Sequence, residues 1–180
     1  LVVVFASKDR NAGVQVADAV RARLTTTSNA RVLYLIPREQ MVSFLESSGY
    51  KADSSLGMTD LKELAKGLRA DELIAGQVSR EGTGPYRVDA RLMMAADPSK
   101  GQPLPVVEGA NLNDVARQVE RVVGDARKQL ADHKACENHI RSSAIDKAII
   151  AANAGIAKYP NATLARLCLA NAFQANKQTD

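Results

Sequence analysis

The feature that most constrains the fold of this chain is an alternation of apolar and polar residues between positions 86 and 94. Apolar residues occupy the even positions, and charged residues occupy most of the odd ones. This period of two is typical of a β-strand that buries one face and exposes the other to solvent. Turn-forming residues at 81–85 separate this stretch from an apolar run at 71–79. The sequence therefore predicts an antiparallel hairpin with one solvated face.

The first half of the chain alternates between predicted strands and helices. Residues 1–6 are apolar throughout and rich in β-branched side chains, which predicts a strand buried on both faces. Apolar residues recur at helical spacing over 14–24 and predict a helix. Residues 31–36 predict a second strand. Two helices are expected after it, the first beginning near Pro37 and the second capped by Thr59.

Two further short elements complete this region. Residues 97–101 predict a turn, and residues 104–108 predict one more short strand. The predicted order is strand, helix, strand, two helices and then a meander of two or three strands. This order favours an α+β or α/β fold class, with a mixed β-sheet packed by helices and followed by a C-terminal α-helical segment.

The pattern becomes helical after residue 110 and stays so, apart from a turn at residues 159–161. A stripe of Val and Ala at helical spacing opens this part, with Asn113 as the expected N-cap. The predicted domains are therefore an α/β domain at residues 1–109 and a helical segment at residues 110–180.

The last helices resemble a tetratricopeptide repeat over residues 145–176. The repeat places Ala early in one helix, Pro at the turn, and Leu, a small residue and an aromatic residue on the next helix. The matching residues here are Ala148, Pro160, Leu169, Ala170 and Phe173. Small residues allow helices to approach closely, and Pro160 ends one helix. Arg166 stands where the pattern prefers a large aromatic residue, and Gly155 weakens its helix. A single repeat cannot bury its own face, so neighbouring helices must complete the stack.

Most of residues 1–108 resembles the amino-terminal domain of TolB and the related CsgG-like envelope proteins. The matching features are the opening strand at residues 1–5, the run at residues 68–78 and the hairpin strand at residues 86–94. The resemblance implies a bacterial envelope or periplasmic setting and contact with other proteins. It brings no catalytic site to this chain.

Composition disfavours several function classes. The net charge is only +4, with basic residues scattered among acidic ones, and aromatic residues make up 4% of the chain, with no Trp. Nucleic-acid binding is therefore not expected, because neither a basic stripe nor a base-stacking platform is present. No apolar stretch reaches membrane-spanning length, so no transmembrane segment is expected, and residues 1–6 are too short for a signal peptide.

The cysteines and histidines allow two interpretations each. Cys136 and Cys168 lie nearly one repeat length apart, so they either form a disulfide or fill helix contacts as buried thiols. His133, Cys136 and His139 follow one another at three-residue steps and either approach a metal ion or serve as surface histidines beside a packed cysteine. The second interpretation is favoured because no fourth ligand is visible, and no metal or cofactor is expected.

Two loops also allow a functional and a structural interpretation. Asp9, Arg10 and Asn11 follow the first strand, at the edge where α/β sheets often bind ligands. They either contact a small molecule or serve as turn and capping residues, and the second role is favoured. Gly82 and Gly84 predict a hairpin turn rather than a phosphate-binding loop, because a strand follows them.

The sequence therefore predicts a non-catalytic adaptor or scaffold of the bacterial envelope or periplasm, with a cytoplasmic location as the alternative. By analogy with helical repeats, the expected partner-binding residues are Asn153, Lys158, Arg166 and Asn171. The expected core between the helices consists of Ile149, Ile156, Leu164, Leu167 and Leu169.

Two alternative functions remain open. The first is a structural accessory subunit of a larger membrane-associated complex, such as an electron-transfer or photosynthetic assembly. The second is a small-molecule-binding sensor domain that uses the loop at residues 7–13. An enzyme is the least favoured class, because the chain has only two histidines and lacks a Gly-x-Ser-x-Gly motif.

Overall fold

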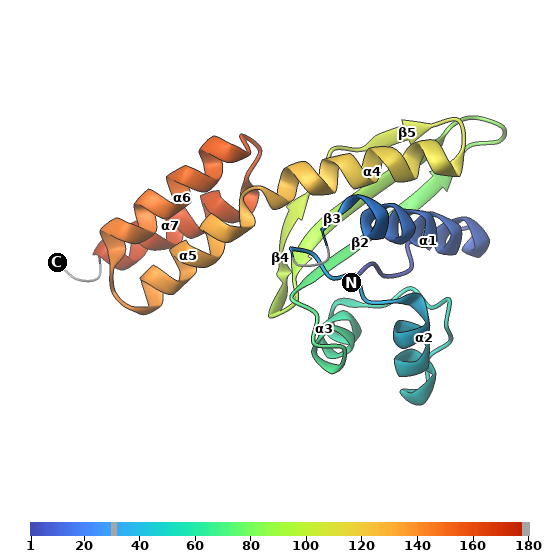
Figure 1. Ribbon diagram of the computed structural model, residues 1–180, viewed down its shortest axis with the longest axis horizontal. Helices are drawn as coiled ribbons and strands as arrows, with labels where there is room; N and C mark the ends of the chain where they lie inside the picture. Colours follow the sequence, from blue (N-terminus) through green and yellow to red (C-terminus); the bar gives the residue numbers. More distant parts are fainter. Residues whose placement is uncertain (30–31, 178–180) are drawn as a thin grey trace. The chain divides into compact units, whose positions relative to one another are not determined.

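A computed structural model of the chain describes residues 1–29 and 32–177; the side chains of Arg10 and Lys177 lie outside that description. Within it, helices and a five-stranded mixed sheet confirm the predicted fold class. The chain forms two compact units, Leu1–Val122 and Val123–Asp180, which divide within helix α4 (Leu112–Arg127). The sequence placed the domain boundary earlier, after Gly109, where the helical pattern begins (Figure 1).

The sheet of the first unit runs in the order β1-β2-β3-β4, and β5 also pairs with β3. Its strands are β1 (Ala6–Ser7), β2 (Glu72–Arg80), β3 (Tyr86–Met94), β4 (Asp97–Pro103) and β5 (Val107–Gly109). β1 pairs with β2 in parallel, and the other pairs are antiparallel. The β2–β3 hairpin is continuous from Glu72 opposite Met94 to Arg80 opposite Tyr86, which confirms the prediction from the alternating pattern.

The opening residues of the chain lie along β2 and are buried on both faces, as predicted. Leu1 to Phe5 are all buried, and Val2 forms a parallel bridge with Ile74. The N–H of Val3 donates to the carbonyl of Ile74 at 3.0 Å, and the N–H of Ile74 donates to the carbonyl of Leu1 at 2.8 Å. A contact across more than seventy positions of sequence therefore fixes the first strand.

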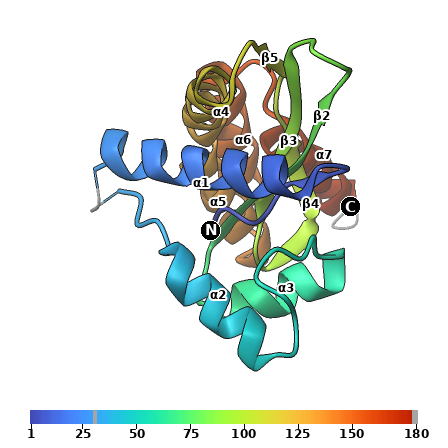
Figure 2. The same ribbon diagram turned by 90° about the vertical axis from the view of Figure 1, so that its right-hand side faces the viewer.

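Helices cover the sheet. Helices α2 (Arg38–Ser47) and α3 (Met58–Gly67) share one apolar cluster with the sheet, and this cluster includes Val3, Leu73 and Met93. Buried residues at alternate positions, such as Ile74 and Leu92, point to the opposite face. Helix α1 (Arg10–Thr27) and the first part of α4 lie over this face, and a hydrogen bond of 3.1 Å from Thr27 to Glu120 joins them (Figures 1 and 2).

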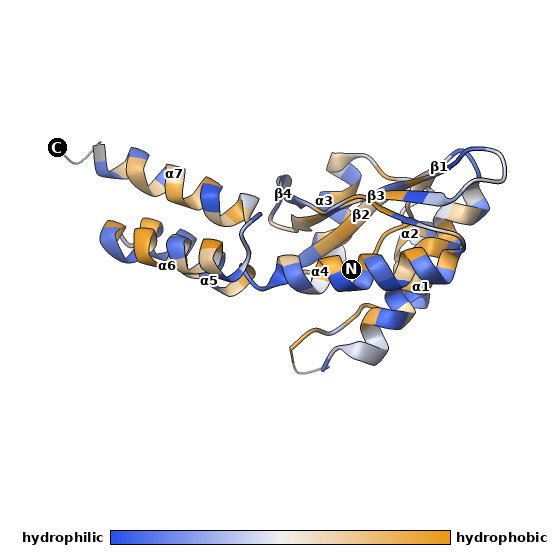
Figure 3. Ribbon diagram, turned by 90° about the horizontal axis from the view of Figure 1, so that it is seen from above, coloured by the Kyte–Doolittle hydropathy of each residue, from blue (hydrophilic) through white to orange (hydrophobic). Residues whose placement is uncertain are grey.

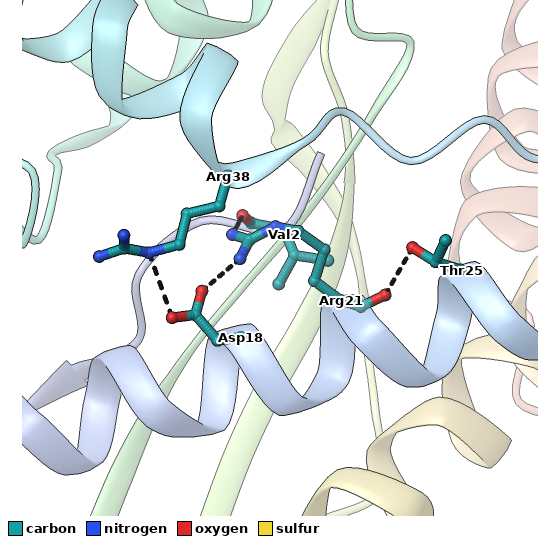
Figure 4. A network of polar contacts seen from close by, with 5 residues as sticks. All are labelled: Val2, Asp18, Arg21, Thr25 and Arg38. Atoms are coloured by element: carbon teal, nitrogen blue, oxygen red, sulfur yellow. Dashed lines mark hydrogen bonds and ion pairs between the residues drawn. The ribbon is translucent and has the colours of Figure 1, made fainter.

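The prediction of a second strand at residues 31–36 is wrong for the described residues 32–36, which form no strand. The physical reason lies at the free edge of the opening strand. Leu1 and Val3 bond to β2, so the backbone groups of Val2 point to the other edge. There the buried guanidinium of Arg21 donates to the Val2 carbonyl at 2.6 Å and takes the acceptor that a neighbouring strand would use (Figure 4).

The predicted turn at residues 97–101 is also wrong, because these residues belong to β4. The chain turns at positions 95 and 96 instead, and Gly101 then pairs with Met93 while Asp97 pairs with Met94. The register shifts between Met93 and Met94, which accommodates the extra residues of β4. One hydrogen bond typical of a turn is still present inside the strand, because the Asp97 carboxylate accepts from the N–H of Ser99 at 3.2 Å.

Two predicted helix caps and one short strand are displaced. Helix α3 begins at Met58 with Gly57 as its N-cap, so Thr59 lies inside the first turn. At the start of α4, the side chain of Asn111, rather than that of Asn113, accepts from the N–H of Asp114 at 3.0 Å. The short strand expected at residues 104–108 is β5, at Val107–Gly109.

The second unit contains α5 (Leu130–Arg141), α6 (Ile145–Lys158) and α7 (Thr163–Lys177), which pack against one another. The predicted turn at residues 159–161 separates α6 from α7. A turn that the sequence did not reveal separates α5 from α6, where Ser143 has a φ of 57°.

The close packing of α1 against the opening strand can be tested at Gly13, with Gly124 as a control. A Cβ added at Gly13 would lie 2.1 Å from the carbonyl oxygen of Phe5, whereas one added at Gly124 in α4 would meet nothing within 4 Å. We expect Gly13→Ala to destabilise the protein by about 1–3 kcal/mol through overpacking. We expect the control Gly124→Ala to stabilise it by about 0.5–1 kcal/mol, because Ala favours a helix. Calorimetric unfolding of both variants checks this, and a neutral Gly13→Ala would contradict the close packing.

Candidate functional site

A cavity of about 780 Å³ opens where β1 and β2 end. Because these strands are parallel, their carboxyl ends meet at one edge of the sheet, where α/β proteins commonly bind ligands. The polar and charged lining residues are Ser7, Lys8, Asp9, Ser55, Gln77, Ser79, Arg80, Glu81 and Tyr86. Hydrophilic residues follow the end of β1 at this edge (Figure 3).

Asp9 has a structural role at this edge. Its Oδ1 accepts from the N–H groups of Asn11 at 3.0 Å and Ala12 at 3.4 Å and so caps α1. This confirms the capping role expected for the loop. The cap also holds the carboxylate at the wall of the cavity. Asn11 does not line the cavity, and the side chain of Arg10 lies outside the described residues.

Arg80 is held in place at the end of β2 by the hairpin turn. Its guanidinium donates to the carbonyl of Gly84 at 2.8 Å, to the carbonyl of Thr83 at 3.3 Å and to the hydroxyl of Tyr86 at 3.0 Å. It also lies 4.5 Å from the centre of the Tyr86 ring, a distance suited to a cation–π contact. Gly82 adopts a φ of 54°, which agrees with the predicted hairpin turn.

Several polar side chains of the lining have no hydrogen-bond or ion-pair partner among the described residues. The side chains of Ser7, Lys8, Ser55, Gln77 and Ser79 make no hydrogen bond or ion pair with the described part of the chain. They come from β1 and the loop that follows it, from the connection between α2 and α3, and from β2. The sequence indicated only the part of this site near Asp9, because Ser55 and Ser79 reach it through non-local packing. The lining contains hydroxyl, amide and charged groups but no His or Cys, which suits binding of a polar ligand.

The helical array of the second unit offers a different kind of surface. Its core is built from small residues: Cys136, Ala148, Ala152, Cys168 and Ala172. The structure joins Cys136 of α5 to Cys168 of α7 in a disulfide, with their Cα atoms 6.3 Å apart. An added Cβ at Gly155 would lie 3.1 Å from the Cβ of Ala165, so this glycine permits the close approach of α6 and α7.

Polar contacts supplement this small core. The side-chain oxygen of the buried Gln129 accepts from the N–H of Ala165 at 3.1 Å, and Lys158 pairs with Asp132 at 2.7 Å. His133 is buried rather than on the surface, and Cys136 is in the disulfide. Among the residues described, no group of three or more His, Cys, Asp or Glu side chains is arranged to hold a metal ion.

The four predicted partner-binding residues, Asn153, Lys158, Arg166 and Asn171, are all exposed. Two of them already have partners, since Lys158 pairs with Asp132 and Arg166 donates to the carbonyl of Pro160 at 2.7 Å. Of the predicted core, Leu164 is buried, while Ile149, Ile156 and Leu169 are half-buried.

The prediction that Leu167 belongs to the core is wrong, because this side chain is 39% exposed. Small residues fill the helix contacts, and α7 turns Ala165, Cys168 and Ala172 inward instead. Phe173 is also exposed, at 50%. Sequence reasoning used Phe173 only as a mark of the repeat and therefore missed both residues as surface features.

No protein-family model, curated protein or solved structure matches this chain. The resemblances to TolB and to tetratricopeptide repeats therefore stay predictions. Within the described ranges, none of the helices combines the length and the apolar character that a membrane crossing requires.

The disulfide allows a direct test of the array. We expect the double variant Cys136→Ala/Cys168→Ala to lose about 3–4 kcal/mol of stability, because the bond closes a loop of about 32 residues in the unfolded chain. Hydrogen exchange measured by mass spectrometry should show faster exchange in α5, α6 and α7. Amides of β2 and β3 serve as the internal control and should be unaffected. Unchanged protection of the array would show that helix packing alone holds it together.

Proposed function

We propose that this chain is a non-catalytic interaction protein whose helical array, α5 to α7, binds a protein partner. The observation that carries the proposal is an apolar ridge on α7 formed by Leu167, Ala170 and Phe173, all three exposed. Leu167 and Ala170 are three residues apart and are therefore neighbours on the helix, as are Ala170 and Phe173, so the ridge winds around the exposed side of α7. Large apolar side chains gathered on a surface are typical of interfaces between proteins.

The surroundings of the ridge indicate the chemistry of the partner. Arg166 and Asn171, two of the predicted partner-binding residues, lie on the same helix beside it and supply a polar rim. Helix α7 carries Arg166 and contains no Asp or Glu. A partner segment with apolar residues in the centre and acidic residues at the rim complements this surface.

The disulfide supports both the mode of binding and the proposed location. It ties α7 to α5, so the ridge is presented on a helix that is already held in place, and binding then orders fewer groups. Disulfides persist in oxidising compartments, which agrees with a periplasmic or envelope setting. The predicted tetratricopeptide-type architecture also favours partner binding.

Replacing the ridge tests this proposal. We expect the double variant Leu167→Ser/Phe173→Ser to bind its partner at least about tenfold more weakly, since exposed anchor residues typically contribute more than about 1 kcal/mol each. The matched control is Val32→Ser, which removes an apolar side chain that is 72% exposed in the other unit. The measurement is crosslinking and affinity capture of the full chain from the native envelope fraction, followed by mass determination of the intact complexes.

The stoichiometry then distinguishes the two forms of the proposal. One large complex of fixed composition indicates a structural accessory subunit, whereas several substoichiometric partners indicate an adaptor. Capture that is equally strong with the ridge variant and with Val32→Ser would contradict the proposed surface.

A further inference from the structure

We propose that the cavity at the carboxyl ends of β1 and β2 binds a small zwitterion of the amino-acid or short-peptide class. This site belongs to the first unit and is independent of the ridge on α7. The proposal rests on the charge balance of the lining, on the way two of its charges are held, and on the uncommitted polar groups around them.

The charges of the described lining residues match a zwitterion better than they match the simpler ligand classes. Among the described residues of the lining, Lys8 and Arg80 are basic, and Asp9 and Glu81 are acidic. A phosphate or nucleotide site requires an excess of positive charge, and a divalent cation requires several converging carboxylates. Two charges of each sign complement a ligand that carries an ammonium and a carboxylate together.

The anionic side of the site is anchored by Asp9. Two backbone N–H groups of α1 hold its Oδ1, and Oδ2 has no hydrogen-bond partner among the described residues. A carboxylate fixed in this way loses little side-chain freedom when it accepts a hydrogen bond from a ligand. Asp9 is therefore the residue we assign to the ligand ammonium.

The cationic side has one group without an ion-pair partner among the described residues and one group held by hydrogen bonds. Lys8 has no ion-pair partner among the described residues, so its ammonium is available to a ligand carboxylate. Arg80 uses one N–H of each of its three nitrogens on Gly84, Thr83 and Tyr86. A guanidinium has five N–H donors in total, so two remain for a ligand.

The rest of the lining and its size suit a peptide. The hydroxyls of Ser7, Ser55 and Ser79 and the amide of Gln77 both donate and accept hydrogen bonds, as a peptide group requires. The cavity of about 780 Å³ lies within the range of about 300–1,000 Å³ that is usual for small-molecule sites. It leaves room for a few residues rather than for one alone.

Calorimetric titration of the full, oxidised chain with trialanine tests the proposal. We expect saturable binding of trialanine. We expect N-acetyl-trialanine and trialanine amide, each of which lacks one terminal charge, to bind at least about tenfold more weakly. Binding of inorganic phosphate or sucrose in place of trialanine, equal binding of the blocked peptides, or no binding at all would each overturn the zwitterion assignment.

Two variants locate the binding site. Asp9→Asn keeps the helix cap, because Asn and Asp cap equally well, but removes the charge, so trialanine should bind about tenfold more weakly with an unchanged melting temperature. Lys8→Gln should weaken binding by a similar factor. The control Lys147→Gln changes the same charge on α6, outside the cavity, and should bind trialanine normally.

The result is separable from the function proposed for the array. Asp9→Asn should leave partner capture by the ridge intact, and Leu167→Ser/Phe173→Ser should leave trialanine binding intact. Normal trialanine binding by both Asp9→Asn and Lys8→Gln would place any peptide site elsewhere and overturn the assignment.

Discussion

The parallel pairing of the opening strand with β2 is the contact on which the first unit depends. It brings the backbone nitrogen of Leu1 to 2.7 Å from the carbonyl oxygen of Glu72, a separation of 71 positions in sequence. The strand it forms is buried beneath helices on both faces, and α1 can reach it only because Gly13 lacks a side chain. The same pairing sets the carboxyl ends of β1 and β2 side by side. The cavity is therefore a consequence of the sheet topology rather than of any single loop.

A buried cation completes the free edge of this strand. Arg21 donates to the Val2 carbonyl and pairs with Asp18, and Asp18 also lies 3.1 Å from Arg38 at the start of α2 (Figure 4). Burial lowers the pKa of Arg21, while the hydrogen bond and charge of Asp18 act in the opposite direction. An Arg side chain stays protonated even when it is buried. The network therefore joins α1, the opening strand and α2 by charge-assisted hydrogen bonds. Because Arg21 occupies the Val2 carbonyl, this edge of the sheet is less available for pairing with a strand of another chain.

The sequence predicted the elements that local patterns determine and missed those that depend on a distant partner. The hairpin and the buried opening strand followed from period two and from β-branched composition. Residues 32–36 have similar composition, but Arg21 occupies the backbone acceptor that their pairing would need. Residues 97–101 look like a turn, yet pairing with β3 makes them part of a strand. The cavity was only partly predictable, because Ser55 and Ser79 join Asp9 through tertiary contacts that no local pattern reports.

At both candidate surfaces, an interaction that stabilises the fold also positions a group that can bind a ligand or partner. The bonds that make Asp9 the cap of α1 also fix its carboxylate at the cavity. The disulfide that closes the small core of the array also holds α7, whose outer side carries the exposed Leu167 and Phe173. In both cases the folding of the chain has already ordered the binding group, so the conformational entropy lost on association is smaller. Such preorganisation offsets in part the small number of large aromatic anchors in this chain.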